Sequence, residues 1–271
     1  IAILYEPGLF PALLHHDSTE KEPVKQNGGV PQAGNIDEHL KIFRINITEL
    51  VKDVNFSGVG VIDFESWRPI FRQNFASLLP YKELSVKIKQ EKYPGKEKTW
   101  YESAAAEKFE LSGWDFVNRT LTLAKELRPK AKWGYYGFPY CFNLNGSPNN
   151  TKENCDSDVQ KENDRIHWLF NASDIIFPSV YLRTTITPDE RLMLIRGRVK
   201  EAVRMANNVT GEPKPRPVLT YIRYVYTDTK TLLEKDDWEK GLNAMKEMGS
   251  NGVILWGSSD DLNSTEKCKD F

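Results

Sequence analysis

The sequence predicts an α/β fold, and within that class it favours a barrel over an open sheet. Short apolar runs alternate with helical patterns about six times along the chain. Most of these runs have no polar face, which is typical of parallel strands that are covered on both sides. An eight-stranded barrel takes about 250 residues, so a chain of 271 residues can carry most of one. Nothing marks a domain boundary, and residues 1–271 are therefore predicted to form a single domain.

Six candidate strands are rich in Val, Ile, Leu and Tyr. They cover residues 1–5, 58–64, 132–137, 175–182, 218–224 and 252–256. Helical patterns lie between them, and the first is the clearest. Residues 36–51 place Leu40, Phe43, Ile47 and Leu50 three or four positions apart. This spacing gathers the four side chains on one face of a helix.

The later helices have recognisable ends. A helix over residues 103–127 is expected to stop before Pro129. Residues 187–190 form a capping box with proline at the first helical position, which predicts the start of the next helix. The last helix, over residues 236–248, ends at Gly249. The polar stretches 82–98 and 143–162 are expected to be long surface loops.

The composition excludes several classes of protein. Hydrophobic residues make up 39% of the chain, which is too many for a disordered protein. The formal net charge is -1, whereas a general binder of nucleic acid or of membrane surfaces would need a basic excess. No apolar run approaches the roughly 18 residues of a membrane span. An anionic ligand must therefore be held by local arginines.

Eight Asn-X-Ser/Thr sequons predict a secreted, extracellular glycoprotein, because chance would give roughly one or two in this length. The acceptor asparagines are Asn46, Asn55, Asn118, Asn145, Asn149, Asn171, Asn208 and Asn263. Of the three cysteines, Cys141 and Cys155 are then expected to form a disulfide that closes a small polar loop. A loop of this size stabilises by about 3 kcal/mol in the chain-entropy model. Cys268 is left over.

The sharpest chemical feature is a pair of acids at the end of the strand over residues 58–64. Side chains alternate along a strand, so Asp63 and Glu65 point one way and Phe64 the other. Carboxyl ends of barrel strands are where barrel active sites lie. Paired carboxylates suit cleavage of a glycosidic bond, since one of them must stay protonated to serve the leaving oxygen. Acids this close in sequence fit cleavage assisted by the sugar's own acetamido group, although a purely structural strand end would show the same two residues.

Aromatic and polar residues at three other strand ends favour a sugar site. They lie at 133–137, 178–183 and 255–261, and aromatic rings stack on the apolar faces of sugars. His15, His16 and His167 lack the spacing of metal ligands. No phosphate loop or dinucleotide fingerprint is present either. We therefore expect neither a metal nor a cofactor.

At these residues the sequence resembles the hyaluronidases of venom, saliva and sperm, glycoside hydrolase family 56. The resemblance rests on motifs at residues 27–32, 58–74, 133–141, 178–183, 197–202 and 256–261, which follow the family's order over nearly the whole chain. The likeness is strongest to the secreted insect enzymes, which are allergens of venom or saliva. It implies a distorted (β/α) barrel of the TIM type and hydrolysis of the β-1,4 linkages of hyaluronan with retention of configuration.

The resemblance also implies a role for each residue of the site. Glu65 is the general acid and then the base, and Asp63 holds the acetamido group that acts as the nucleophile. The substrate-binding residues that match the family pattern are Arg68, Tyr136, Ser179, Tyr181, Arg198, Trp256, Ser258 and Asp260. Cys141 and Cys155 match the family's short loop disulfide. Cys268 matches one half of a longer disulfide, whose other half lies outside this chain.

The chain departs from the family pattern at its two ends, and two alternatives for its function stay open. The family's domain begins upstream of Ile1 and continues past Phe271, so the chain is expected to lack its first barrel strand and to be incomplete at both ends. The sequence does not separate hyaluronan from chondroitin as the substrate, and it does not predict an oligomeric state. A non-catalytic secreted protein that binds glycosaminoglycans on the same fold is the alternative to an enzyme. The presence of both Asp63 and Glu65 favours the enzyme.

Overall fold

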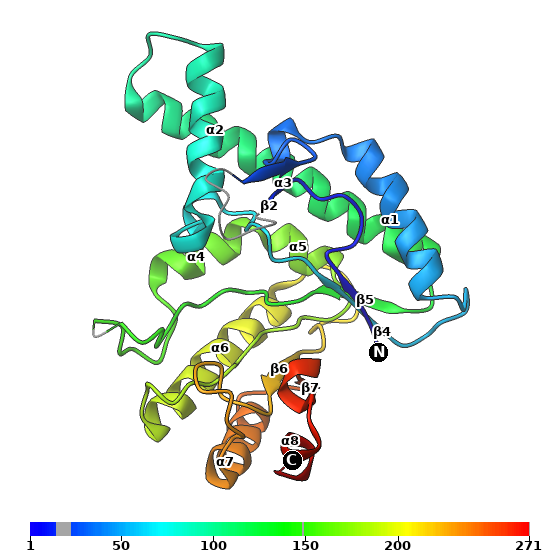
Figure 1. Cartoon of the computed structure of the whole chain (residues 1–271), viewed down its shortest axis with the longest axis vertical. Coiled ribbons are helices and arrows are strands. Elements are labelled where there is room, and N and C mark those ends of the chain that lie inside the picture. Colours follow the sequence, from blue (N-terminus) through cyan, green and yellow to red (C-terminus); the bar gives the residue numbers. More distant parts are fainter. Residues whose placement is uncertain (15–22, 148, 271) are drawn as a thin grey trace. The chain divides into compact units, whose positions relative to one another are not determined.

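A computed structural model describes residues 1–14, 23–147 and 149–270 (Figure 1). The chain divides into two compact units, unit 1 (Ile1–Trp133) and unit 2 (Gly134–Phe271). Each unit has its own parallel strands and its own packed helices. The single domain expected from the sequence stays a prediction. Within the described part of the chain, no helix is long and apolar enough to cross a membrane.

Parallel strands form the centre of unit 1. Strand β1 (Ala2–Tyr5) pairs in parallel with β4 (Val59–Asp63), and the register places Tyr5 opposite Asp63. Strand β5 (Lys132–Tyr135) begins in unit 1, where the Lys132 amide donates to the Gly58 carbonyl at 3.0 Å, and ends in unit 2. A Cβ atom at Gly60 would lie 2.3 Å from the Trp133 ring. Glycine is therefore required where β4 meets this indole.

Two long helices cover unit 1. Helices α1 (Ile36–Leu50) and α3 (Lys98–Leu127) contact each other and lie side by side in Figure 1. Both predicted helices are confirmed, although α3 begins before residue 103. The first turn of α1 is capped by Asn35, whose side chain accepts from two backbone amides. Such a cap satisfies amides that have no partner inside the helix.

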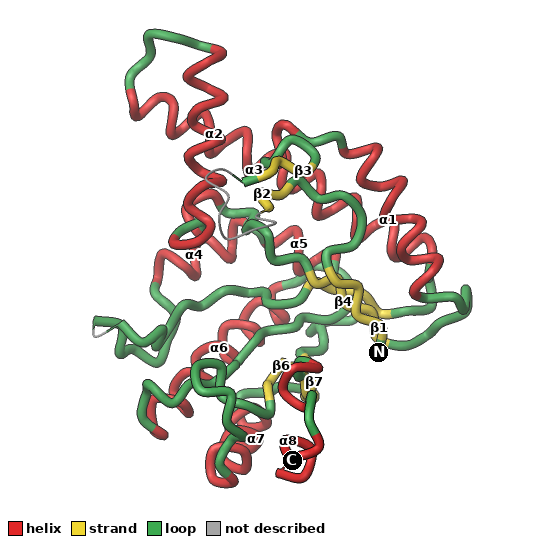
Figure 2. Tube along the Cα trace, in the orientation of Figure 1, coloured by secondary structure: helices red, strands yellow, loops and turns green. Residues whose placement is uncertain are grey.

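The prediction of a loop over residues 82–98 is wrong. Helix α2 (Leu79–Lys92) occupies most of this stretch and packs along the beginning of α3 (Figure 2). Only Tyr81 and Ser85 of α2 are buried, and the Ser85 hydroxyl donates to the Tyr81 carbonyl at 2.7 Å. The apolar face is therefore narrow, and frequent lysines conceal the helical period in the sequence.

A short hairpin of unit 1 was not predicted either. Strand β2 (Ala12–Leu14) pairs antiparallel with β3 (Val24–Gln26). His15 and His16 lie outside the described residues. Next to the hairpin in sequence, Phe10 stacks on Phe64 with ring centroids 3.9 Å apart. Phe64 thus points into an aromatic core, as the alternation along its strand predicts.

Unit 2 has its own parallel sheet. Strands β6 (Leu219–Arg223) and β7 (Gly252–Trp256) pair in parallel, with Arg223 opposite Trp256. The predicted strand over residues 175–182 is an extended segment that meets β6 through single bridges. Pro178 interrupts the regular ladder because proline has no amide hydrogen to donate. Its carbonyl still accepts from the Tyr221 amide at 2.8 Å.

The helix predictions for unit 2 are confirmed at both of its long helices. Helix α6 (Pro188–Asn208) starts with the predicted capping box at Thr187 and Glu190. Helix α7 (Lys235–Glu247) is followed by Gly249, which has a φ of 95°. The sequence did not predict three short helices, which are α4 (Ser157–Arg165), α5 (His167–Ala172) and α8 (Thr265–Asp270). The predicted loop over residues 143–162 therefore ends where α4 begins.

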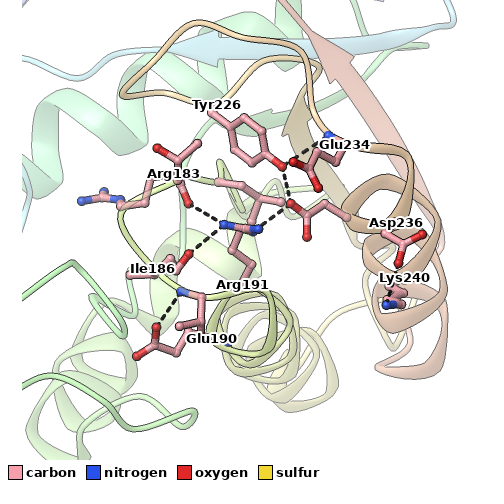
Figure 3. A network of polar contacts seen from close by, with 12 residues as sticks. Arg183, Ile186, Glu190, Arg191, Tyr226, Glu234, Asp236 and Lys240 are labelled. Atoms are coloured by element: carbon pink, nitrogen blue, oxygen red, sulfur yellow. Dashed lines mark hydrogen bonds and ion pairs between the residues drawn. The ribbon is translucent and has the colours of Figure 1, made fainter.

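A buried arginine ties α6 to α7 (Figure 3). Arg191 Nε lies 2.8 Å from Oδ2 of Asp237, and both side chains are buried. Arg191 also donates to the Ile186 carbonyl at 2.7 Å, and the Tyr226 hydroxyl donates to Asp237. A buried charge needs partners of this kind, because an unpaired one costs several kcal/mol. The network fixes the loop before α6 against α7.

Candidate active site

The two acids of the predicted site lie where β4 of unit 1 ends. Asp63 is the last residue of the strand and is half-buried, and Glu65 is exposed two positions further on. Phe64, between them, is 3% exposed and belongs to the aromatic core. Both carboxylates therefore leave the strand on the face that is directed away from the core.

A third carboxylate belongs to this site, and sequence reasoning missed it. Glu6 directly follows β1, and its amide donates to the Asp63 carbonyl at 2.8 Å. Its carboxylate accepts from the Glu65 amide at 3.0 Å and from the Ser66 hydroxyl at 3.3 Å. The residue has a φ of 40°, a conformation that non-glycine residues adopt rarely. An acid at the end of the neighbouring predicted strand was the signal that could have revealed it.

The environment favours the protonated forms of these acids. Burial raises the pKa of Asp63 to about 7, and the negative charges of Glu65 and Glu6 add to the effect. Burial also raises the pKa of Glu65, while the positive charge of Arg68 opposes the shift. The pKa of Glu6 is raised as well, mainly by burial. Carboxyls that hold a proton near neutral pH can act as general acids.

Arg68 is held beside this carboxylate pair by its own loop. Its Nη1 donates to the Gln73 carbonyl at 2.6 Å, and its amide donates to Asn74 Oδ1 at 2.9 Å. The guanidinium also lies 5.0 Å from the centre of the Phe75 ring. This anchoring keeps a positive charge close enough to influence Glu65.

The predicted aromatic residues of unit 2 form a row. The rings of Tyr136 and Tyr181 have centroids 6.3 Å apart, and those of Tyr181 and Trp256 are stacked at 5.9 Å. The three residues come from the end of β5, from the extended segment 175–182 and from the end of β7. Three neighbouring strand ends thus bring three rings together, of which Tyr181 and Trp256 are half-buried and Tyr136 is 8% exposed. The accessible part of this row suits the faces of sugar rings.

Polar groups accompany this row. The Tyr136 hydroxyl donates to Ser179 Oγ at 3.1 Å, and Arg198 Nη1 donates to the Ser179 carbonyl at 2.9 Å. Arg198 Nε donates to Asn143 Oδ1 at 3.1 Å. Burial lowers the pKa of Arg198 to about 10, and the charge of Arg183 contributes. Within the described part of the chain, no carboxylate forms an ion pair with Arg198, which leaves its charge available for an anionic ligand.

Ser258 and Asp260 form a turn after β7. Ser258 Oγ accepts from the Asp260 amide at 3.3 Å, and the Ser258 amide donates to Asp261 Oδ2 at 3.0 Å. Asp261 in turn accepts hydrogen bonds from Nε and Nη2 of Arg223, whose guanidinium lies 5.1 Å from the Trp256 ring centre. Sequence reasoning placed Asp261 in the polar stretch 255–261 without a role of its own and missed Arg223, although these two fix the turn. The turn borders a hollow of about 830 Å³ on unit 2.

The short disulfide supports the aromatic row. Cys141 and Cys155 are bonded as predicted, with Cα atoms 4.9 Å apart. The loop that they close carries Asn143, which is 3% exposed and donates to the Glu153 carbonyl at 2.7 Å. The partner of Arg198 is thus held inside a cross-linked loop. Cys268 is an exposed free thiol, and its pairing with a cysteine outside this chain stays a prediction.

The sequons differ in accessibility. Those that are exposed are Asn55, Asn145, Asn149, Asn208 and Asn263, and those that are half-buried are Asn46, Asn118 and Asn171. Glycosylation of any of them stays a prediction.

Among the described residues, no group of three His, Cys, Asp or Glu side chains could hold a metal ion.

Comparison with known proteins identifies the family. The family model described as hyaluronidase, glycoside hydrolase family 56, matches residues 1–271. A hyaluronidase of Apis mellifera is 48% identical over 100% of this chain and 70% of its own length. Hyaluronidase A of Vespula vulgaris is 48% identical over 99% of this chain and 80% of its own length.

Solved structures agree with the sequence relatives. A crystal structure of bee venom hyaluronidase superposes with a TM-score of 0.92 at 47% identity, over 100% of this chain and 82% of the other. A second structure of that enzyme, in complex with a hyaluronic acid tetramer, superposes with a TM-score of 0.94 at 48% identity and the same coverage. The predicted family and fold class are therefore confirmed. This chain, a TIM-type α/β fold with an acid pair at the end of β4, belongs to the hyaluronidases of glycoside hydrolase family 56.

Proposed function

We propose that this chain is a secreted endoglycosidase that hydrolyses the β-1,4 linkages of hyaluronan. The observation that carries the proposal is its 48% identity, over 100% of the chain, to an enzyme crystallised with a hyaluronic acid tetramer. The Asp63 and Glu65 pair supports turnover, since both acids are present and both have raised pKa values. A binding protein without turnover would have no need for a proton donor in this position.

In the proposed reaction, Glu65 acts first as the acid and then as the base. The carbonyl oxygen of the substrate's acetamido group attacks the anomeric carbon. As the glycosidic bond breaks, Glu65 gives its proton to the leaving oxygen. A water molecule then opens the cyclic intermediate from the opposite face and returns a proton to Glu65. Two inversions at one carbon give net retention.

Asp63 holds the acetamido group in the position for attack. A carboxylate beside the acetamido N–H accepts its hydrogen bond and stabilises the positive charge that develops on the ring-closed intermediate. The negative charge of Glu65 helps to raise the pKa of Asp63, and a proton held by two interacting carboxyls belongs to the pair. We assign that shared proton to Glu65 in the reacting complex, with the negative charge on Asp63. The raised pKa of Asp63, about 7, favours retention of that shared proton up to neutral pH.

Unit 2 supplies groups for holding the polymer. The row of Tyr136, Tyr181 and Trp256 suits sugar faces, and the hydroxyl of Ser179 suits their edges. Arg198 carries a charge that no carboxylate of the described residues neutralises, which suits the carboxylates of hyaluronan. We assign Arg68, Ser258 and Asp260 to polymer binding as well.

A product assay tests the proposal. The protein is incubated separately with hyaluronan and with unsulfated chondroitin, which differ in the orientation of one hydroxyl, and new reducing ends are counted. The anomeric configuration of the first products is followed by NMR. We expect hyaluronan fragments whose new ends are initially in the β configuration. A protein that binds hyaluronan but releases no reducing ends would instead be the non-catalytic alternative, and initial α anomers would exclude retention.

A further inference from the structure

The hairpin of α2 and α3 carries an exposed surface that the catalytic chemistry leaves unexplained. Its tip, residues 87–98, holds five lysines and two glutamates, whereas the whole chain has a net charge of -1. Tyr93 and Trp100 are 40% and 39% exposed there. In Figure 1 this tip projects beyond the other elements of unit 1. Aromatic rings and positive charge are thus concentrated on an outlying part of the unit.

The tip has a defined conformation, because one buried side chain holds the turn between α2 and α3. The Tyr101 hydroxyl donates to the Tyr93 carbonyl at 2.7 Å and accepts from the Lys96 amide at 2.9 Å. Tyr101 is 6% exposed, so it clamps both sides of the turn from inside. The rings of Tyr93 and Trp100 meet edge to face at 5.6 Å, and Trp100 meets Tyr101 in the same way at 5.5 Å.

Three lysines surround this aromatic pair. The ammonium groups of Lys89 and Lys92 lie 5.9 and 5.4 Å from the centre of the Tyr93 ring, and that of Lys96 lies 5.7 Å from Trp100. Contacts of this kind are worth about 0.5–1 kcal/mol at exposed sites. They hold the ammonium groups in place without neutralising their charge, which remains available for an anion.

We propose that this surface, formed by Lys89, Lys92, Tyr93, Lys96 and Trp100, is a second binding site for the anionic polysaccharide that the enzyme cleaves. Exposed aromatic rings stack on the faces of sugars, and ammonium groups pair with carboxylates. A ligand that offers both at short, regular intervals is an acidic polysaccharide. The inference rests on the proposed function for the identity of the polymer.

The distance along α3 between the tip and the residues near Glu65 is short enough for one polymer chain to span. A Cβ atom at Gly113 would lie 3.1 Å from Trp67, the second residue after Glu65. Trp100 lies on the same helix, about 20 Å from Gly113 at 1.5 Å per residue. A long polymer that is held at the tip raises its effective concentration at the catalytic acids. A short oligosaccharide gains nothing from the tip.

Two surface variants test the inference by kinetics. The charge variant is Lys89→Glu with Lys92→Glu and Lys96→Glu, and the ring variant is Tyr93→Ala with Trp100→Ala. Both keep Tyr101. We expect kcat/KM for high-molecular-weight hyaluronan to fall at least fivefold for the charge variant and at least threefold for the ring variant. Hydrolysis of a hyaluronan hexasaccharide should stay within twofold of the unmodified protein.

A matched control carries the same change in charge at the other end of α3. Lys41→Glu, Lys52→Glu and Lys130→Glu alter exposed lysines of α1 and of the chain around the end of α3. This control should leave both substrates unaffected, and the polymer advantage of the unmodified protein should shrink as salt screens the charges. Equal losses on polymer and hexasaccharide, or no loss on either, would overturn the inference.

A binding experiment separates this inference from the proposed function. Polymer binding is measured in a Glu65→Gln background, where the ligand is not consumed, with and without the surface variants. We expect at least a fivefold weaker Kd for the charge variant. Vesicles of phosphatidylserine and single-stranded DNA serve as competing probes. Binding of either at the tip in preference to hyaluronan would reject the polysaccharide, whereas absence of turnover in the unmodified protein would reject only the proposed function.

Discussion

The strand ends of unit 1 and those of unit 2 carry different kinds of side chain. In unit 1, β1 and β4 end in Glu6, Asp63 and Glu65, whose pKa values are all raised. In unit 2, the strand ends hold stacked rings, and Arg198 of α6, which has no acidic partner among the described residues, donates to Ser179 beside them. The first set consists of carboxyls that can donate a proton, and the second offers ring faces and a positive charge. The comparison separates side chains that take part in the chemical step from side chains that bind the polymer.

The two regions also differ in how their side chains are supported. Hydrogen bonds between adjacent strand ends place the acids of unit 1. The Glu6 amide donates to the Asp63 carbonyl, and the Glu6 carboxylate accepts from the Glu65 amide. In unit 2, Arg198 depends on Asn143 in a disulfide-closed loop. Substitutions in unit 1 should therefore act on kcat and on its pH dependence, and substitutions in unit 2 should act on KM.

The largest effect is expected for Glu65→Gln. The amide keeps the size of the side chain but cannot give a proton, so kcat should fall by about 10³ or more, while KM for hyaluronan changes less than threefold. Initial rates of reducing-end release over a range of polymer concentrations measure both quantities. The control is Glu49→Gln, an exposed glutamate of α1. Turnover within tenfold of the unmodified protein would contradict the assignment of the acid.

Asp63→Asn should have the next largest effect. The amide cannot supply the negative charge that stabilises the intermediate, so kcat should fall by about 10². Comparison of the free energies of unfolding of the two proteins shows whether the loss is chemical. Because a half-buried charge is removed, the variant should be at least as stable at pH 7. Unchanged kinetics would remove Asp63 from the mechanism.

The pH dependence of the unmodified protein should follow the acids of unit 1. With the pKa of Asp63 near 7, the pair loses its shared proton above neutral pH, and kcat/KM should then fall about tenfold per pH unit. The rate is measured between pH 4 and 9 at constant ionic strength. A rate that still rises at pH 8 would contradict the need for a protonated pair.

Arg198→Ala should act mainly on binding. Loss of a charge-assisted hydrogen bond to a carboxylate costs about 1.5–3 kcal/mol, so KM should rise at least tenfold with kcat nearly constant. Arg198→Lys should recover part of the loss, because it keeps the charge but not the fork of donors. Arg196→Ala on the same helix is the control. An equal fall in kcat for Arg198→Ala would mean that unit 2 contributes to the chemical step.

The sequence predicted what depends on local periodicity. A period of two along a strand was sufficient to place Asp63 and Glu65 on the opposite face from Phe64. A capping box was sufficient to locate the start of α6 at Pro188. These features are set by residues within a few positions of each other, and their physical causes can be read directly in the chain.

The features that the sequence missed depend on distant neighbours. Glu6 contacts Glu65 across 59 positions, and Asn143 contacts Arg198 across 55. Helix α2 was missed because it buries few side chains, and Pro178 lies in a segment where single bridges replace a regular ladder. Only the register of β1 on β4 makes Glu6 a neighbour of the acid pair.

Glu6→Gln should have the smallest effect, because it removes a nearby negative charge without removing a reacting group. The amide oxygen can still accept from the Glu65 amide. The negative charge that helps to raise the pKa of Asp63 is lost. Protonation of the pair then becomes less favourable, so the fall in rate should begin at lower pH, by about half a unit. The same pH series on Glu6→Gln and on the Glu49→Gln control measures the shift. A shift to higher pH would mean that Glu6 acts through the shape of the turn, whereas an unchanged profile would show that its charge does not reach Asp63.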